Sequence, residues 1–267
     1  PDGCRVNAVI PPLAIDGACI TIRKFSKKKI DLSKMVEFGS ISEQMRKVLE
    51  IAGRCRLNIV ISGGTGSGKT TLMNAVSRSI ENTERIVTIE DAAELRIPLP
   101  HVVRLESRPP SLEGAGAVPI RALVRNALRM RPDRIVVGEV RGGEALDMLS
   151  AMTTGHEGSL STLHASSPGD AIRRLQTLAL MGDLDLPYRA VEQQVASALD
   201  VVVHQARRPD GARRIVEVAA VAAGRDGPVL TPLVTWRPGA AAGGRFAWTP
   251  AGLSWADAAV ADAAAQG

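Results

Sequence analysis

The sequence predicts an α/β fold in which helices cover both faces of a mostly parallel sheet. The first reason is the string GGTGSGKTT at residues 63–71, which fits the pattern G-x-x-x-x-G-K-[ST]. The second is its context: residues 57–61 are apolar and rich in β-branched side chains, and residues 71–80 place apolar side chains at helical spacing. The third is the alternation of strand and helix patterns up to residue 198, which is typical of parallel sheets.

The glycine-rich string has the composition of a phosphate-binding loop. Glycines allow successive backbone N–H groups to turn inward around a phosphate, and the following helix N-terminus adds unpaired donors. In such a loop the lysine reaches the β- and γ-phosphates and the next hydroxyl ligates Mg²⁺. We therefore expect ATP and Mg²⁺ as ligands, with a chance glycine turn as the alternative. The expected nucleotide-binding residues here are Gly63, Gly64, Thr65, Gly66, Ser67, Gly68, Lys69, Thr70 and Thr71, with Thr70 also on the metal.

The remaining elements follow in chain order. A capping box at residues 40–43 (SISE) predicts a helix that buries Met45, Val48, Leu49 and Ala52. The turn sequence at residues 209–211 (PDG) predicts a hairpin between the strands 201–203 and 214–221. Further strands are expected at residues 6–10, 19–25, 85–89, 101–105, 135–137 and 159–164, and further helices at 119–130, 144–152, 169–181 and 188–198.

Composition and turn signals divide the chain into four segments. Residues 1–25 predict the C-terminal part of a small α+β N-terminal domain, and the chain begins without Met, so we expect a preceding part. Residues 26–39 predict a basic hinge linker. Residues 40–249 predict the main domain, with the hairpin region at its C-terminal end. Residues 250–267 form an Ala-rich tail that suits a loose helix.

Charge and composition limit the partners. The net charge of +5 lies within residues 1–60, which hold 11 Lys and Arg against 6 Asp and Glu. This excess fits an anionic partner, although a solvated linker face is the simpler interpretation. Only 3% of residues are aromatic, so a stacking surface for nucleic acid is not expected. No apolar run reaches the length of a membrane span, and the three cysteines suit free thiols, so we expect an intracellular protein.

Three residues outside the phosphate-binding loop lie at the carboxyl ends of predicted core strands. Open α/β sheets bind their ligands at these strand ends. Glu139 is the expected catalytic base, because a carboxylate there can take a proton from water. Glu90 is expected to hold Mg²⁺ or polarise that water, and His164 to contact the γ-phosphate. The alternatives are a helix cap for Glu139, a surface acid for Glu90 and a core histidine for His164. Gly138 occupies the position where the second Walker motif normally carries Asp.

Several arginines are candidate arginine fingers, which would complete the site of a neighbouring subunit. Arginines are common on helix surfaces, so a structural role is the simpler interpretation for each one. The candidates are Arg104, Arg121, Arg125 and Arg141.

Four strings together resemble the secretion ATPase superfamily of type II and type IV secretion, type IV pili and archaeal flagella. They are GGTGSGKTT at 63–71, TIEDAAEL at 88–95, RMRPDRIVVGEVRGGEA at 129–145 and TGHEGSLSTLHA at 154–165. Glycine before the catalytic glutamate is this family's own pattern. The strings at 6–25 and 104–145 are most similar to the tight-adherence (Flp) pilus and conjugal-transfer branch. The similarity covers roughly residues 5–225.

The resemblance implies a RecA-like P-loop NTPase core and a Mg²⁺-dependent ATPase that forms a homo-hexameric ring. It implies docking on inner-membrane assembly platform proteins at the cytoplasmic face, where hydrolysis drives extrusion of pilin or another substrate. By the same resemblance, Arg23 of the small domain approaches the nucleotide. Two alternatives stay open: a conjugal-transfer ATPase that translocates DNA, and a nucleotide-gated scaffold with little turnover.

Overall fold

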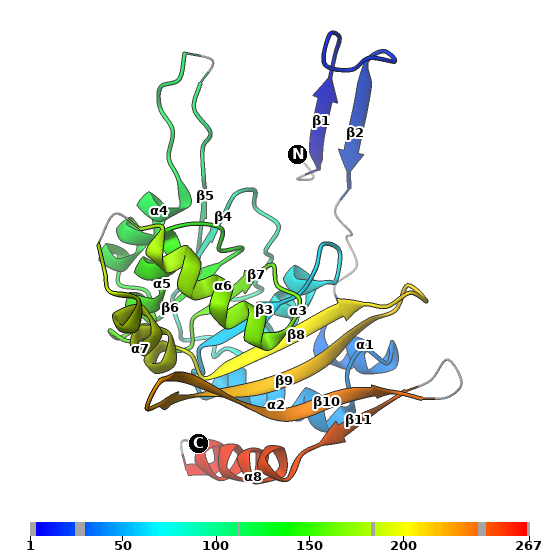
Figure 1. Cartoon of the computed structure of the whole chain (residues 1–267), viewed down its shortest axis with the longest axis vertical. Helices are drawn as coiled ribbons and strands as arrows, with labels where there is room; N and C mark the ends of the chain where they lie inside the picture. The colour runs from blue at the N-terminus through cyan, green and yellow to red at the C-terminus, as the bar shows by residue number, and fades with distance from the viewer. Residues whose placement is uncertain (1–3, 25–29, 112, 183–184, 240–243, 266–267) are drawn as a thin grey trace.

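A nine-stranded sheet forms the centre of the molecule in the computed structural model, which describes residues 4–24, 30–111, 113–182, 185–239 and 244–265 (Figure 1). Its spatial order is β11-β10-β9-β8-β3-β7-β6-β4-β5. The six strands from β8 to β5 run parallel, and the remaining three extend the sheet in antiparallel fashion. The bounds are β3 (Ile59–Ser62), β4 (Ile86–Glu90), β5 (Val102–Glu106), β6 (Arg134–Val137), β7 (Leu160–Leu163), β8 (Val201–Arg207), β9 (Arg213–Gly224), β10 (Gly227–Pro238) and β11 (Gly244–Trp248).

Helices pack on both faces of this sheet, so the predicted fold class is confirmed. Strand side chains alternate between two apolar cores; for example, Val60 joins one core while Ile59 and Ile61 join the other. The first core includes α4 (Ile120–Ala127), α5 (Glu144–Met152), α6 (Pro168–Leu180) and α7 (Tyr188–Ala198). The second includes α1 (Leu32–Glu37), α2 (Glu43–Arg54), α3 (Lys69–Val76) and, through Trp255, α8 (Pro250–Ala265). Short 3₁₀ turns η1 (Ser77–Ser79) and η2 (Leu128–Met130) follow α3 and α4.

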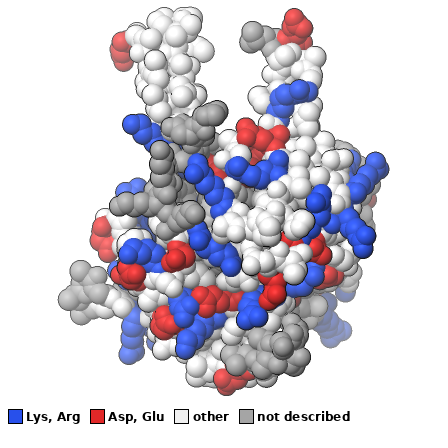
Figure 2. Space-filling model, turned by 180° about the vertical axis from the view of Figure 1, so that it is seen from behind, with Lys and Arg blue, Asp and Glu red and all other residues white. Residues whose placement is uncertain are grey.

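Two hairpin-like segments project from the same end of the molecule (Figure 1). The first pairs β1 (Arg5–Val9) with β2 (Cys19–Arg23) as a separate two-stranded sheet. It exposes apolar side chains, including Val6 and Ile20, and Figure 2 shows few charged residues on it. The second projection follows β5 and is closed by a bridge between Arg108 and Val118. Among the described residues, no helix is both long and apolar enough to cross a bilayer.

The expected basic linker contains a short helix that the sequence did not predict. The Asp31 side chain accepts a 2.8 Å hydrogen bond from Lys34 N and so caps α1, which buries Leu32 and Met35. These two side chains belong to the second core, so residues 30–39 pack on the main domain. Lys27, Lys28 and Lys29, the most basic part of the linker, lie outside the described residues. The hinge and the other segment boundaries stay predictions.

Two further details differ from expectation. The cap of α2 is Ser42, whose hydroxyl accepts a 3.2 Å bond from Met45 N, and not Ser40 as the capping box implied. Ser40 is used elsewhere, because its carbonyl accepts a 3.1 Å bond from Ile215 N of β9. The predicted hairpin of β8 and β9 is confirmed, but β10 and β11 were not expected.

Candidate active site

The glycine-rich loop joins β3 to α3, as its sequence context predicted. Lys69 is only 9% exposed, and its ammonium donates to the carbonyls of Gly63 (3.0 Å) and Gly64 (3.1 Å). Burial lowers the pKa of Lys69, and Arg141 adds to this while Glu139 opposes it. Gly63 has φ 155°, and a Cβ there would lie 2.1 Å from the carbonyl oxygen of Gln205. Only glycine therefore allows β8 to lie directly against the loop.

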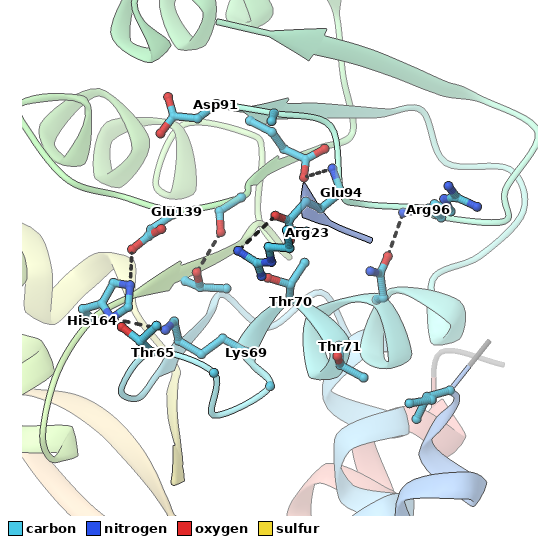
Figure 3. A pocket seen from close by; sticks show the side chains of 18 of the residues that line it. Arg23, Thr65, Lys69, Thr70, Thr71, Asp91, Glu94, Arg96, Glu139 and His164 are labelled. Atoms are coloured by element: carbon cyan, nitrogen blue, oxygen red, sulfur yellow. Dashed lines mark hydrogen bonds and ion pairs between the residues drawn. The ribbon is translucent and has the colours of Figure 1, made fainter. Parts of the chain in front are cut away.

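A pocket of about 580 Å³ opens beside the loop at the carboxyl ends of the parallel strands. Figure 3 shows its side chains. Most of the predicted site residues line it together: Arg23, Thr65, Gly66, Gly68, Lys69, Thr70, Thr71, Glu90, Glu139, Arg141 and His164. The loop residues Gly63, Gly64 and Ser67 and the arginines Arg104, Arg121 and Arg125 are not among its lining residues.

His164 lies between Glu139 and Lys69 (Figure 3). Its Nε2 is 2.7 Å from Glu139 Oε1, and that oxygen has no hydrogen-bond partner. Its Nδ1 is 3.5 Å from Lys69 Nζ. Burial, followed by the Lys69 charge, lowers the pKa of His164, against the effect of Glu139. Arg141 Nη2 donates to the other Glu139 oxygen at 2.5 Å. Glu139 is thus a carboxylate held by two basic groups inside the pocket.

Glu90 is 4% exposed and lies directly against Gly138. Its Oε1 accepts 2.9 Å bonds from Glu94 N and Leu95 N, whereas its buried Oε2 has no hydrogen-bond partner. Burial raises the pKa of Glu90, against the effect of these two bonds. A Cβ at residue 138 would lie 2.8 Å from Glu90 Cγ. The missing Walker aspartate therefore has a steric reason, because the neighbouring strand supplies a glutamate that needs the space.

The predicted arginines occupy different places. Arg121 and Arg125 contact the two oxygens of Asp147 on α5, at 2.8 and 2.9 Å, away from the pocket. Arg104 is exposed on β5 and donates to the Ala93 carbonyl at 3.3 Å. Arg141 lies in the pocket, where its Nη1 is also 3.1 Å from Asp91. Whether any of them acts on a neighbouring subunit stays a prediction.

Two residues of the small hairpin and the C-terminal strands also reach the pocket. Arg23, 65% exposed, approaches Glu94 at 3.8 Å. Arg213 of β9 donates from Nε to the carbonyl of Gly66 in the loop at 3.0 Å. The sequence contained no signal for Arg213, because it lies 147 positions from Gly66 and meets it only through the strand order of the sheet.

The pocket's donor set fits Mg²⁺ bound with phosphate. Among the described residues, no group of three or more His, Cys, Asp or Glu side chains could hold a metal ion alone. Mg²⁺ sites of nucleotide enzymes use few protein ligands and complete the shell with phosphate and water. Thr70 and Glu90 line the same pocket, and their side chains carry hard oxygen atoms of this kind.

Fold and site together define an α/β protein of the P-loop class, with nucleotide-binding geometry at the carboxyl ends of its strands. The chain belongs to the type II/IV secretion system protein family, whose sequence model matches residues 1–222. The predicted superfamily is thereby confirmed, whereas the tight-adherence branch stays a prediction.

Named relatives agree with this membership. A Mycobacterium tuberculosis protein that is provisionally named as a conjugal transfer protein is 44% identical to this chain over 217 residues. The match covers 81% of this chain and 61% of that protein. The type IV secretion system protein PtlH of Bordetella pertussis is 40% identical over 242 residues, 81% of this chain and 71% of that protein. The VirB11 ATPase of the Brucella suis type IV secretion system, solved with sulphate, is 33% identical with a TM-score of 0.59, covering 82% of this chain and 71% of that one. This chain thus spans about three fifths of the length of the mycobacterial relative.

Proposed function

We propose that this chain hydrolyses ATP and serves as the motor of a secretion or pilus assembly machine. The observation that carries the proposal is the sequence of contacts Lys69–His164–Glu139 within one pocket, with separations of 3.5 and 2.7 Å. A phosphate-binding lysine and a carboxylate base that both lie next to one histidine are suitably placed for the attack of water on a terminal phosphate. The solved ATPase relative supports the same activity.

Each side chain has a defined task in this proposal. Lys69 and the loop N–H groups bind the β- and γ-phosphates, and Thr70 and Glu90 hold the metal ion. Bound Mg²⁺ neutralises charge that develops on the phosphate. Glu139 accepts the proton of the attacking water, and His164 donates toward the γ-phosphate. Arg141 holds Glu139 in place through its 2.5 Å contact.

We further propose self-assembly into a ring, a homo-hexamer, on the cytoplasmic side of an inner-membrane platform, with membrane association through partner proteins. The support is the naming of relatives in type IV secretion. Closure of the small hairpin, which carries Arg23, about a hinge that precedes α1 would couple nucleotide binding to domain motion. The cargo is pilin or another substrate of the machine.

A DNA-translocating conjugal-transfer ATPase is the second candidate, favoured by the name of the mycobacterial relative. The low aromatic content and the balanced charge after residue 60 count against a nucleic-acid track. Stimulation of ATP turnover by DNA at physiological salt would favour this candidate over the pilus motor.

The test is ATP turnover measured against protein concentration, together with mass by light scattering. We expect specific activity to rise as the ring forms. Glu139→Gln should keep ATP binding and lower turnover by about 10²–10⁴-fold, because it removes the base and keeps the shape. Lys69→Ala is the control that loses binding. Wild-type binding without turnover would instead indicate a nucleotide-gated scaffold, and absence of binding would exclude the ATPase.

A further inference from the structure

The hairpin of β8 and β9 extends beyond the sheet and lies against the phosphate loop. Parallel pairing of β3 with β8 ends at Ser62 and His204, so Gln205 and the residues after it have no partner on β3. The loop begins at that point and runs along the overhanging hairpin. The carbonyl of Gln205 is so close to Gly63 that a Cβ there would lie 2.1 Å away.

A β-bulge sits where this overhang begins. On β9, Glu217 pairs with His204 and Ile215 pairs with Gln205, so Val216 is an extra residue. Bulges bend a strand and redirect its side chains, and they are frequent beside active sites. Beyond the bulge, Gln205 and Arg213 face the loop: a Cβ on Gly68 would lie 3.2 Å from Gln205 Nε2 and 3.3 Å from Arg213 Cδ.

Arg213 makes the direct contact, a 3.0 Å hydrogen bond from Nε to the carbonyl oxygen of Gly66. In a trans peptide the C=O and the following N–H point in opposite directions. The Ser67 N–H that follows donates to the Gly64 carbonyl at 3.3 Å, so the bond from Arg213 and this turn bond fix the Gly66–Ser67 peptide from both of its sides. Gly66 has φ 70°, and no heavy atom lies within 4 Å of the place where a Cβ would stand. The bond from Arg213 therefore restrains a glycine that has no packing around this position.

The strand that carries Arg213 is itself held in place. Ile215 N donates to the Ser40 carbonyl at 3.1 Å, and Arg214 Nη1 donates to the Gly39 carbonyl at 3.2 Å. The ring centroid of Trp236 on β10 lies 4.4 Å from the Cζ of Arg208 and 5.4 Å from the Cζ of Arg214, so the ring packs against both guanidinium groups. A group on such a supported strand can set the position of a glycine-rich loop.

From these contacts we propose that Arg213 is a positioning residue that holds the phosphate loop in its binding conformation from the antiparallel part of the sheet. The inference rests on the proposed function for its effect on ATP, but the ordering of the loop does not require that function.

The experiment measures loop order and nucleotide affinity separately. Hydrogen–deuterium exchange of peptides covering residues 63–72 is recorded without nucleotide, and the Kd of methylanthraniloyl-ATP with Mg²⁺ is measured by fluorescence. Arg213→Ala should increase loop exchange and weaken Kd by about tenfold, the effect of one charge-assisted hydrogen bond. Arg213→Gln should retain most of both, because the amide nitrogen of Gln stands at the same bond distance from the backbone as Nε of Arg. Arg207 is exposed and pairs with Arg213 across the two strands. Arg207→Ala is the charge-matched control, and its loop exchange and Kd should match those of wild type.

The outcomes separate the alternatives. Unchanged loop exchange in Arg213→Ala would overturn the proposal, and if Gln and Ala then weaken Kd equally, the arginine acts by its charge on the phosphate. If wild type binds no methylanthraniloyl-ATP but Arg213→Ala still loosens the loop, the positioning role stands and the proposed ATPase function fails. Thermal unfolding of each variant checks that the fold is intact.

Discussion

At the residue scale, neighbouring strands restrict which side chains the site can hold. Gly138 directly follows β6, and Glu90 ends the adjacent parallel strand β4. The Glu90 side chain occupies the space where a side chain at residue 138 would lie. Two backbone N–H groups hold one Glu90 oxygen, and the other is buried without a hydrogen-bond partner. The glycine and the glutamate therefore act as a pair, with the acid moved by one strand relative to the usual Walker arrangement.

Gly138→Ala should lower the free energy of unfolding by about 1–3 kcal/mol, because the new Cβ would stand 2.8 Å from Glu90 Cγ in a packed site. In the Glu90→Ala background the same change should cost much less. Denaturant unfolding of the two single variants and the double variant measures this coupling. Gly64→Ala is the control for stability, since no heavy atom lies within 4 Å of its Cβ position. Additive effects of the two changes would contradict the steric explanation.

A buried histidine next to the loop should make stability depend on pH. His204 is 6% exposed, its Nδ1 lies 2.9 Å from Ser62 Oγ, and burial lowers its pKa, with Asp170 opposing and Lys69 adding to the shift. Below pH 6.5 the unfolded chain binds a proton that the folded protein resists, so stability falls as pH decreases from 6.5 toward the lowered pKa. The slope contributed by His204 should approach about 1.4 kcal/mol per pH unit.

The measurement compares unfolding free energies of wild type and His204→Asn between pH 7.5 and 5.5. The asparagine keeps a polar group near Ser62 and removes the titration, so its loss of stability should be smaller. His164, whose pKa is also lowered, leaves a residual slope in both proteins. The exposed His101→Asn is the control and should keep the wild-type slope. Equal slopes in wild type and His204→Asn would rule out this role for His204.

At the element scale, one buried ion pair ties together the ends of several elements opposite the pocket. Arg134 begins β6 and is fully buried, with Nε and Nη2 on the two oxygens of Glu84 at 2.7 and 2.6 Å. Its Nη1 donates to the carbonyls of Gly53, at the end of α2, and Gly158, before β7. Because every donor direction is used, the pair holds β6 in register with its neighbours, and β6 in turn carries Glu139.

Arg134→Met should lower the free energy of unfolding by about 3–5 kcal/mol, because Glu84 would remain as a buried charge without its partner. Urea unfolding followed by circular dichroism gives the value. The matched control is Arg54→Ala, which breaks the exposed 3.3 Å pair with Glu81 and should cost no more than about 1 kcal/mol. Similar costs for the two variants would show that burial does not decide the strength of these pairs.

At the scale of the whole molecule, the arginine candidates differ in which subunit they could serve. Arg141 lies in its own pocket beside Glu139, so its effect should stay within one chain. Arg125 is 52% exposed on α4 and is held at Asp147 away from the pocket, so it can reach only another subunit's nucleotide. This distinction depends on the proposed ring.

Mixing inactive variants tests that distinction. Arg125→Ala mixed with Glu139→Gln should regain part of the wild-type ATP turnover, because each subunit supplies the group that the other lacks. Arg141→Ala mixed with Glu139→Gln should stay inactive. Arg129→Ala, an exposed arginine one helical turn further on, is the control and should keep wild-type turnover alone. Full activity of Arg125→Ala alone would exclude it as an arginine finger.

Local patterns in the amino-acid sequence were enough to predict the core of the fold and the place of the site. The loop at residues 63–71 depends on local glycine conformations and a following helix, and strand patterns depend on the nearest neighbours in the chain. Since parallel strands end at one edge, Glu90, Glu139 and His164 could be expected to meet there, and they line one pocket.

Contacts between groups that lie far apart in the chain could not be predicted, because they depend on how the elements pack in space. Three contacts join residues that are 22 to 147 positions apart in the chain. They are the bond from Arg213 to Gly66, the fit of Glu90 against Gly138 and the pairing of Arg125 with Asp147. The strand order, and for Arg213 the bulge at Val216, sets these contacts, and neither leaves a local pattern in the sequence. The use of Ser42 to cap α2 and the bond from Ile215, 175 positions away, to the Ser40 carbonyl likewise left no local pattern.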